Sequence, residues 1–521
     1  MYVVELVRKT IHMIRQKAKA VSQITLDDDC NIPESMPDAG MIIQEKGKIE
    51  IEEVKTENAG VTVRGALLFF ILYMEDAEEG GLYSVKGRIP FEEHIHVESV
   101  GDGDSVQLRW MLEDVSAVLI NSRKFGVKTV ASLEITAEEL RDAEVPVEAP
   151  EKEGLQIRTC PVSAAALTVK KRDTCRIKDE IILPANKPNI RQIIWQDAVL
   201  QGTELKTGEG EILIKGELAV FVLYEGEEEG KPGWLEQILP FTSRVDAAGC
   251  QEGMPGILEA SLSGCELEAK PDYDGELRVL HADALLELDI RLYREERLNL
   301  ICDLYSLKEE LLPQMRRETY ESLLVSSVSK CRAAQRIRTG NQEAQILQLC
   351  HSSGEVKVDE SRVTDEGIFV EGAVQVQTLY VTSDDSHPML CLKGSVPFEH
   401  LTEVPGIRPD SSCFIHASLD QLSAEMTGNG ELEIRVTVLI SALIFAPMSF
   451  ECITEVQEAP LDIEAVKALP GFLLYTVQSS DTLWDIAKAG RTAPARICEL
   501  NGISEEDVKT GQKLLLMKEI G

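Results

Sequence analysis

Apolar and polar residues alternate along most of this chain, which is the pattern of β-strands that bury one face. In residues 431–445 one face is formed by Leu432, Ile434, Val436, Val438 and Ile440, and the opposite face by Glu433, Arg435, Thr437, Leu439 and Ser441. Residues 284–293 repeat the pattern, with Leu286, Leu288, Ile290 and Leu292 opposed by Glu287, Asp289 and Arg291. The pattern predicts a mainly β protein.

Three stretches of the chain resemble one another. They are VRGALLFFILY (63–73), IKGELAVFVLY (214–224) and VEGAVQVQTLY (370–380), and each has a glycine, seven residues and then a tyrosine preceded by leucine. A Pro-Phe pair follows each tyrosine after 16 or 17 residues. We expect structural roles for these anchors, which are Gly65, Tyr73, Pro90, Phe91, Gly216, Tyr224, Pro240, Phe241, Gly372, Tyr380, Pro397 and Phe398.

The first two copies keep one register over a long upstream stretch. Pro33 and Pro37 correspond to Pro184 and Pro188 at a constant offset of 151 residues. Copy three lacks both prolines, and Gly340 and Ala344 fall near their positions, so its front part has diverged. Short strands and glycine-bearing turns in units this long favour tandem sandwiches or partly open barrels over a thin solenoid.

Composition divides the chain further. We expect β-rich repeats at 1–140, 155–305 and 320–455, and a small C-terminal domain at 472–518. Residues 141–154 and 451–471 are acidic and contain proline, as linkers do. Residues 307–324 look helical around Pro313. Residues 5–23 suit a helix or a strand, and their place before Pro33 favours extended structure.

Bulk properties exclude some functions. A formal charge of −36 over 521 residues disfavours binding to nucleic acid or to anionic lipid. Basic residues interrupt the first 19 positions, where a secretory peptide needs an apolar segment. The longest apolar run, 65–74, is about half of the roughly 20 residues that a membrane-spanning helix requires. We therefore expect a cytosolic protein without a signal peptide or transmembrane segment.

The 12 cysteines are scattered and include no CxxC pair, which disfavours structural zinc and a disulfide framework. We expect most of them to be buried reduced thiols, with oxidative cross-linking in an assembled layer as the alternative.

No catalytic motif is found. The chain lacks GxSxG, HExxH and GxxxxGK[ST], and the GDGD stretch at 101–104 has the character of a turn. His94 and His96 are spaced to share one strand face, but copy two has Arg244 and Asp246 at these positions. We therefore expect a solvated histidine pair, no catalytic residue, no metal and no cofactor.

The C-terminal residues change in character. LLYTVQ (473–478) reads as a strand, and Asp481 or Thr482 can cap the helix that follows. Pro494 suits the first turn of a second helix, which Asn501 and Gly502 can end. KLLLM (513–517) closes the unit as a strand. The predicted order is strand, helix, helix, strand.

This order resembles the LysM domain. The matching residues are Tyr475, Val477, Gln478, Asp481, Thr482, Leu483, Trp484, Ile486, Ala487, Ile497, Leu500, Asn501, Gly502, Gly511, Gln512, Lys513 and Leu514. The resemblance implies a βααβ fold with a shallow groove for N-acetylglucosamine polymers. The candidate groove residues, for a protein partner or for sugar, are Ser480, Asp481, Thr482, Leu483, Trp484, Asn501, Gly502 and Ile503.

Two of these positions leave the ligand open. Ser480 replaces the glycine usual in the family, in the loop that would contact sugar. Trp484 is either a platform for sugar or partner, or a half-buried residue of the first helix.

Three long β-rich repeats followed by one LysM-like domain resemble the SipL-type spore coat morphogenetic proteins, whose repeats are called SPOCS domains. Residues 26–40 and 181–190 are similar to the opening motif of those domains. The resemblance implies a non-enzymatic scaffold and adaptor in the mother-cell cytoplasm, at the forespore surface and in the spore coat. It also implies that the LysM domain docks a coat basement-layer morphogenetic ATPase, with other coat proteins as further partners.

The alternative is a peptidoglycan-binding LysM protein of the cell wall or spore cortex. A hydrolase is a weaker third possibility, since no site for one is recognisable. Neither nucleic acid binding nor membrane insertion is expected.

Overall fold

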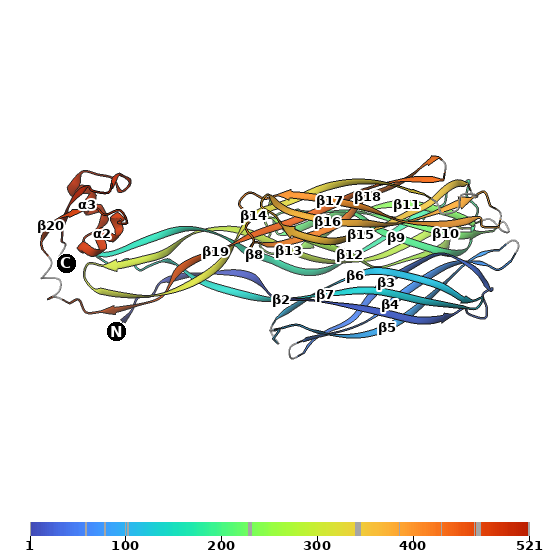
Figure 1. Ribbon diagram of the computed structural model, residues 1–521, viewed down its shortest axis with the longest axis horizontal. Coiled ribbons are helices and arrows are strands. Elements are labelled where there is room, and N and C mark those ends of the chain that lie inside the picture. Colours follow the sequence, from blue (N-terminus) through green and yellow to red (C-terminus); the bar gives the residue numbers. More distant parts are fainter. Residues whose placement is uncertain are drawn as a thin grey trace.

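The computed structural model describes the chain except residues 1, 58–59, 78–79, 99, 102–103, 228–231, 339–344, 385, 429, 463, 465–469 and 519–521. The molecule is elongated (Figure 1). β-sandwiches fill one end, long paired strands run from them as a stalk, and a small helical module lies at the far end of that stalk. Gly340 and Ala344, which stand near the missing prolines of copy three, lie outside the described residues.

Each repeat is built from two antiparallel three-stranded sheets. In repeat 1 one sheet has the order β3-β4-β5 and the other β2-β7-β6. The first sheet is a meander, and the second pairs the first strand of the repeat with its last. The bounds are β2 (Val7–Asn31), β3 (Ala39–Glu57), β4 (Gly60–Glu75), β5 (Leu82–His96), β6 (Ser105–Asn121) and β7 (Lys124–Glu148).

Repeats 2 and 3 follow the same plan. The sheets of repeat 2 are β9-β10-β11 and β8-β13-β12, and those of repeat 3 are β15-β16-β17 and β14-β19-β18, with β1 (Tyr2–Val3) added beside β19. Repeat 2 has β8 (Leu155–Ile182), β9 (Ile190–Thr207), β10 (Glu211–Gly226), β11 (Pro232–Asp246), β12 (Gly256–Pro271) and β13 (Leu277–Ser306). Repeat 3 has β14 (Glu310–Arg338), β15 (Ile346–Val363), β16 (Gly367–Thr382), β17 (Met389–Glu403), β18 (Ser412–Gly428) and β19 (Glu431–Ala459).

Each repeat has its own core between its two sheets. The alternating sets predicted from the sequence line these cores: Leu286, Leu288, Ile290 and Leu292 in repeat 2, and Leu432, Ile434, Val436, Val438 and Ile440 in repeat 3. The mainly β fold and the three sandwich-like repeats are therefore confirmed, and the barrel alternative is not adopted.

The Gly…Pro-Phe signature is a cross-strand pair. In the three repeats Gly65 faces Phe91, Gly216 faces Phe241 and Gly372 faces Phe398 across neighbouring strands. A Cβ added to Gly216 would lie 2.8 Å from the ring of Phe241, so only glycine leaves room for the aromatic side chain.

The signature tyrosine holds the start of the repeat. The Tyr73 hydroxyl donates to the carbonyl oxygen of Pro37 at 3.2 Å, and Tyr224 donates to Pro188 at the same distance. This bond explains why tyrosine and the upstream proline recur together in copies one and two.

The leucine before each tyrosine serves another purpose. Leu72, Leu223 and Leu379 lie in one buried cluster, which also contains Trp195 and Phe221. We call this cluster, together with the charged residues described next, the shared centre. Equivalent residues of the three repeats therefore meet in one place.

Three charged residues from equivalent strands lie in the shared centre. Asp197 on β9 forms an ion pair with Lys46 on β3, and it lies 3.2 Å from Nε2 of His351 on β15. Nδ1 of His351 is 3.0 Å from Glu236, and Phe221 stacks on the imidazole with ring centroids 4.2 Å apart. Burial disfavours the imidazolium, but the two carboxylates outweigh it and raise the pKa of His351.

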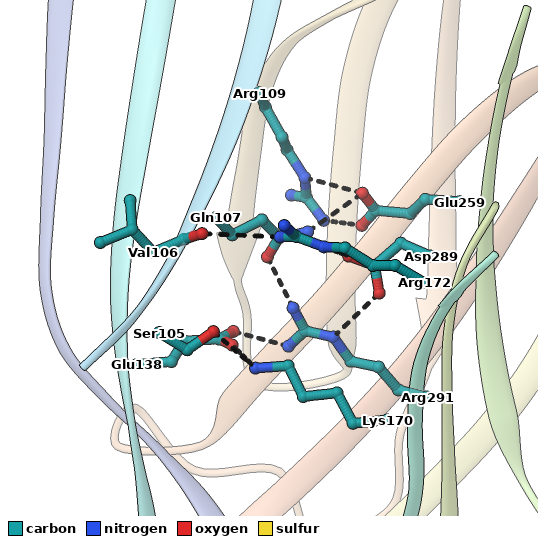
Figure 2. Close-up of polar contacts among 10 residues, drawn as sticks. All are labelled: Ser105, Val106, Gln107, Arg109, Glu138, Lys170, Arg172, Glu259, Asp289 and Arg291. Carbon is teal, nitrogen blue, oxygen red and sulfur yellow. Dashed lines mark hydrogen bonds and ion pairs between the residues drawn. The ribbon is translucent and has the colours of Figure 1, made fainter. Parts of the chain in front are cut away.

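A second polar contact joins repeats 1 and 2 (Figure 2). Arg291 on β13 donates to Glu138 on β7 at 2.6 Å and to Gln107 on β6 at 2.8 Å, and Lys170 reaches Glu138 at 2.9 Å. Arg291 is only 3% exposed, although its strand face is the polar one in the sequence. That strand face packs against the neighbouring repeat and is not exposed to water.

Leu439 needs a similar correction. We expected it on the face opposite the core, with Glu433 and Ser441, yet it is 4% exposed. Next to it, Leu443 and Phe445 pack with Ile14, Ala165 and Tyr293 of the other two repeats, so β19 is buried on both faces here.

The stalk consists of the far ends of three strand pairs: β2 with β7, β8 with β13, and β14 with β19. They share an apolar cluster that includes Ile11, Val145, Val162, Leu300, Tyr320 and Cys452. The prediction of extended structure for residues 5–23 is confirmed, since β2 covers most of them.

Three other predictions about these segments are wrong. Residues 141–148 belong to β7 and residues 451–459 to β19, so both expected linkers begin as strands. Residues 307–324 are not helical, because β14 starts at Glu310. Pro313 is tolerated there because β14 lies at the edge of its sheet, the position at which proline occurs in strands.

Two cysteines form a disulfide. Cys160 on β8 and Cys302 on β13 are bonded, with their Cα atoms 6.1 Å apart, so the expectation of reduced thiols is wrong for this pair. The other ten are free, but only Cys250, Cys331, Cys350 and Cys452 among them are buried.

Candidate functional site

The C-terminal module has the predicted strand, helix, helix, strand order. Its elements are β20 (Phe472–Thr476), α2 (Leu483–Gly490), α3 (Pro494–Asn501), the 3-10 turn η1 (Glu505–Asp507) and β21 (Lys513–Met517), with β20 and β21 paired. Leu483, Ile486, Ile497, Leu514 and Leu516 form its core.

The first groove loop is fixed by local hydrogen bonds. Thr482 is the N-cap of α2 and accepts from the backbone N–H of Asp485 at 3.2 Å. Asp481 accepts from the N–H of Gln478 at 2.8 Å and from the Tyr475 hydroxyl at 2.7 Å, and these bonds lower its pKa. Of the two candidate caps, Thr482 caps the helix while Asp481 closes the turn before it.

The second groove loop begins at Asn501. Its amide donates to the carbonyl oxygens of Ile497 and Leu515, and its side-chain oxygen accepts from the N–H of Leu515 at 2.7 Å. Gly502 follows with φ 64°, the left-handed cap that glycine allows. Asn501 therefore ties α3 to β21.

The structure divides the eight candidate groove residues into two groups. Ser480, Thr482 and Gly502 are exposed, while Asp481, Asn501 and Ile503 are partly exposed. Leu483 and Trp484 are only 3% and 7% exposed. The groove surface is thus made by the two loops, and the first helix turns its apolar residues inward.

Ser480 adopts its loop without strain. Arg491, with φ 49°, is the one non-glycine residue in the described part of the chain that has a positive φ. The glycine usual at position 480 is therefore not required here by the backbone angle.

Trp484 points toward the stalk rather than toward the loops. Its ring N–H donates to Asp303 at 2.7 Å, and its ring meets Tyr305 edge-on with centroids 4.9 Å apart. Lys488, one turn further on α2, donates to the same Asp303 carboxylate at 2.8 and 2.9 Å. Burial opposes ionisation of Asp303, but these two hydrogen bonds outweigh it and lower its pKa.

Three more contacts complete this junction between module and stalk. The Tyr305 hydroxyl donates to the carbonyl oxygen of Thr492 at 2.8 Å, and Arg491 forms an ion pair with Glu310 on β14. The guanidinium of Arg158 on β8 lies 5.6 Å from the centroid of the Trp484 ring. The α2 face is therefore occupied by the chain itself, which leaves the groove loops free.

Sequence reasoning missed Asp303, Tyr305, Glu310 and Arg158. They lie on repeat strands far from the module in sequence, and only the long reach of β8, β13 and β14 brings them there. One signal was available in the sequence: the loop after the first helix, AGRTAPA (489–495), is atypical for a LysM domain, and its Arg491 and Thr492 both contact the stalk.

The outer face of the β20–β21 hairpin is apolar. Phe472 and Leu474 are 66% and 60% exposed, and Leu515 opposite Leu474 is 37% exposed. A cavity of about 310 Å³ opens beside this hairpin, between β20 and α2, and is lined by residues such as Leu473, Tyr475, Ile486 and Leu516. This module therefore offers apolar surface as well as its loops.

No metal site is apparent among the described residues, since no three His, Cys, Asp or Glu side chains gather to form one. His94 contacts Thr62 at 3.1 Å on an exposed strand face. Within the described ranges, no helix has the length and apolar content to cross a bilayer.

Comparison with known families agrees with this architecture. The description "SipL, SPOCS domain" matches residues 38–120, 189–270 and 345–427, and "LysM domain" matches residues 475–516. Each range falls inside one of the four predicted units. No curated protein and no solved structure matches the chain.

The fold and the C-terminal module define a tandem β-repeat protein that carries a LysM domain. More specifically, the chain has the domain architecture of the SipL type, with three SPOCS domains before the LysM domain. Its domains indicate a sporulation coat protein with a module of the peptidoglycan-binding kind. SPOCS and LysM are both non-catalytic domain families.

Proposed function

We propose that the protein is a non-enzymatic scaffold and adaptor of spore coat assembly, whose LysM domain docks a coat basement-layer morphogenetic ATPase at the forespore surface. The observation that carries this proposal is the position of the module. It sits at the tip of the stalk, held through α2, and its groove residues Ser480, Thr482 and Gly502 stay exposed.

The charge distribution supports a protein partner. The formal charge of the whole chain is −36, whereas residues 473–521 contain seven acidic and six basic residues. The repeats therefore repel non-specific contacts while the nearly neutral module can approach an acidic or a basic surface.

The exposed apolar side chains favour protein over sugar. Phe472 and Leu474 project from the hairpin, and apolar side chains of this kind form the centre of protein interfaces. A glycan, by contrast, needs hydrogen-bonding groups along the groove.

Peptidoglycan binding is the second candidate. It is favoured by the LysM match and by the exposure of both groove loops, in which Ser480 and Gly502 are unobstructed. In this case the protein would belong to the cell wall or the spore cortex.

A paired binding assay separates the two. The intact chain is offered to the purified coat ATPase and to purified peptidoglycan, beside Ser480→Arg in the first groove loop and Asp27→Arg on the exposed face of β2. We expect the wild type and Asp27→Arg to bind the ATPase, Ser480→Arg to bind it more weakly, and none to stay on peptidoglycan. Retention on peptidoglycan that Ser480→Arg abolishes, without ATPase binding, would contradict the proposal.

A further inference from the structure

The disulfide lies directly below the junction that holds the LysM module. Along the paired strands β8 and β13, Cys160 faces Leu300 and Arg158 faces Asp303. Cys302 is the extra residue of a bulge between Ile301 and Asp303, so the disulfide crosses the pair at the point where strand pairing is interrupted.

Residues close to the two cysteines in sequence make the contacts that hold the module on the stalk. Asp303, next to Cys302, accepts from Trp484 and Lys488 at 2.7 and 2.8 Å. Arg158, two residues before Cys160, lies over the Trp484 ring and 4.0 Å from the Asp485 carboxylate. The relative position of Arg158 and Asp303 therefore decides whether both can reach α2.

We propose that the Cys160–Cys302 pair is a redox switch that sets how firmly the LysM module is held on the stalk. The disulfide fixes the bulge and keeps Arg158 and Asp303 opposite each other. Reduction breaks the covalent link across the strand pair and leaves two thiols, which are weak hydrogen-bond donors and cannot replace it. The bulge is then free to shift, and the module loosens.

The oxidation needs a small-molecule disulfide such as cystine. One protein thiolate attacks cystine to form a mixed disulfide and release one cysteine, and the second protein thiolate displaces the other. Two electrons pass to cystine, whose S–S bond breaks, and the two thiol protons end on the released cysteines. Cys160 and Cys302 are both partly exposed, so a small thiol or disulfide can reach the pair.

This switch does not depend on the partner of the LysM domain, and its test measures docking alone. The intact protein is equilibrated with cystine or with dithiothreitol, and hydrogen–deuterium exchange is followed in residues 483–490 and 302–306. We expect several-fold faster exchange in both segments after reduction. Residues 432–440, in the core of repeat 3, serve as the unchanged reference.

Three variants sharpen the test. Cys160→Ser should exchange like the reduced wild type under both conditions, and Cys175→Ser, on the same strand within the sandwich, should still switch. Asp303→Asn keeps both cysteines and should exchange fast in either state, which shows that the readout reports docking. Should Cys160→Ser fail to fold, the reduced wild type supplies the same state.

Two results would overturn the proposal. One is equal exchange of residues 483–490 in the two states, while thiol labelling shows that the pair has changed. The other is a pair that stays reduced at every cystine concentration tested.

Discussion

The shared centre and the LysM junction each depend on one carboxylate, but they enclose it differently. Asp197 in the shared centre is fully buried against His351, whose side chain is 3% exposed, while its other partner Lys46 is 38% exposed. Asp303 at the junction is 16% exposed, and its partner Lys488 is 42% exposed. Separating the buried charges of Asp197 and His351 costs much free energy because water cannot solvate them. The partly exposed charges of Asp303 and Lys488 can separate at small cost.

This difference indicates two kinds of assembly within one chain. The three repeats share a buried interior formed by their equivalent leucines. The LysM module is attached at a partly exposed boundary, which we propose can open. A scaffold that presents a movable docking module is consistent with this arrangement.

The largest effect on stability is expected when the Asp197 carboxylate of the shared centre is removed. Asp197→Ala removes the one fully buried carboxylate that pairs with the buried His351, which then keeps only the partly exposed Glu236, and we expect a loss of about 3 kcal/mol in the free energy of unfolding. Because the centre is common to all repeats, urea unfolding should shift as one transition. Asp27→Ala, an exposed carboxylate on β2, is the control and should change stability by less than about 0.5 kcal/mol. Loss of one repeat alone would contradict the shared centre.

At the junction, Trp484→Ala should have the next largest effect. The variant loses a buried ring and its hydrogen bond to Asp303, and we expect the docked module to be destabilised by about 3 kcal/mol. The loss should appear as faster hydrogen exchange in residues 483–490 and 514–516, with the unfolding transition of the repeats unchanged. If the repeats were destabilised as well, the two regions would not be separable in this way.

Asp303→Asn should loosen the junction more gently. It keeps the size of the side chain but removes the charge that pairs with the partly exposed Lys488, so the free energy of docking is expected to weaken by about 1 kcal/mol. The module core is untouched, so β21 should keep its protection while α2 and residues 303–306 exchange faster. Unchanged exchange in α2 would show that Asp303 does not hold the module.

A change of pH should produce the smallest effect. The pKa of His351 is raised above its ordinary value of 6.5, so its stabilising contribution is complete below about pH 6.5 and falls as the pH rises through the folded value. The urea midpoint should therefore fall between pH 6 and pH 9, and fall less in His351→Gln. His94→Gln, on an exposed strand face, should follow the wild type. Equal pH dependence in His351→Gln would exclude the imidazolium as its cause.

The sequence predicts well the features that lie within a single repeat or within the LysM module. Alternation identified the sandwich cores. The signature marked the Gly–Phe cross-strand pair of all three copies and the tyrosine–proline bond of copies one and two. The helices of the LysM module could also be predicted, since the residues that begin or end them, Thr482, Pro494 and Gly502, act on the adjacent backbone. All these features depend on residues close in sequence or in neighbouring strands.

The contacts between repeats could not be predicted. Arg291 and Leu439 occupy strand faces that read as solvent-facing, and only the packing of the three repeats against one another buries them. The segment around Pro313 was predicted as a helix because its local pattern of apolar residues fits a helix as well as it fits an edge strand. Trp484 stayed undecided in the sequence since its partners Asp303 and Tyr305 lie about 180 residues away.

The most direct test of the central proposal is where the protein goes during sporulation. The chain carries a fluorescent tag and is imaged in sporulating cells, beside Ser480→Arg and Asp27→Arg. The account predicts a shell around the forespore for the wild type and Asp27→Arg, and a weaker shell for Ser480→Arg. Diffuse signal throughout sporulation, or signal in the vegetative wall, would contradict a coat scaffold that docks through its LysM domain.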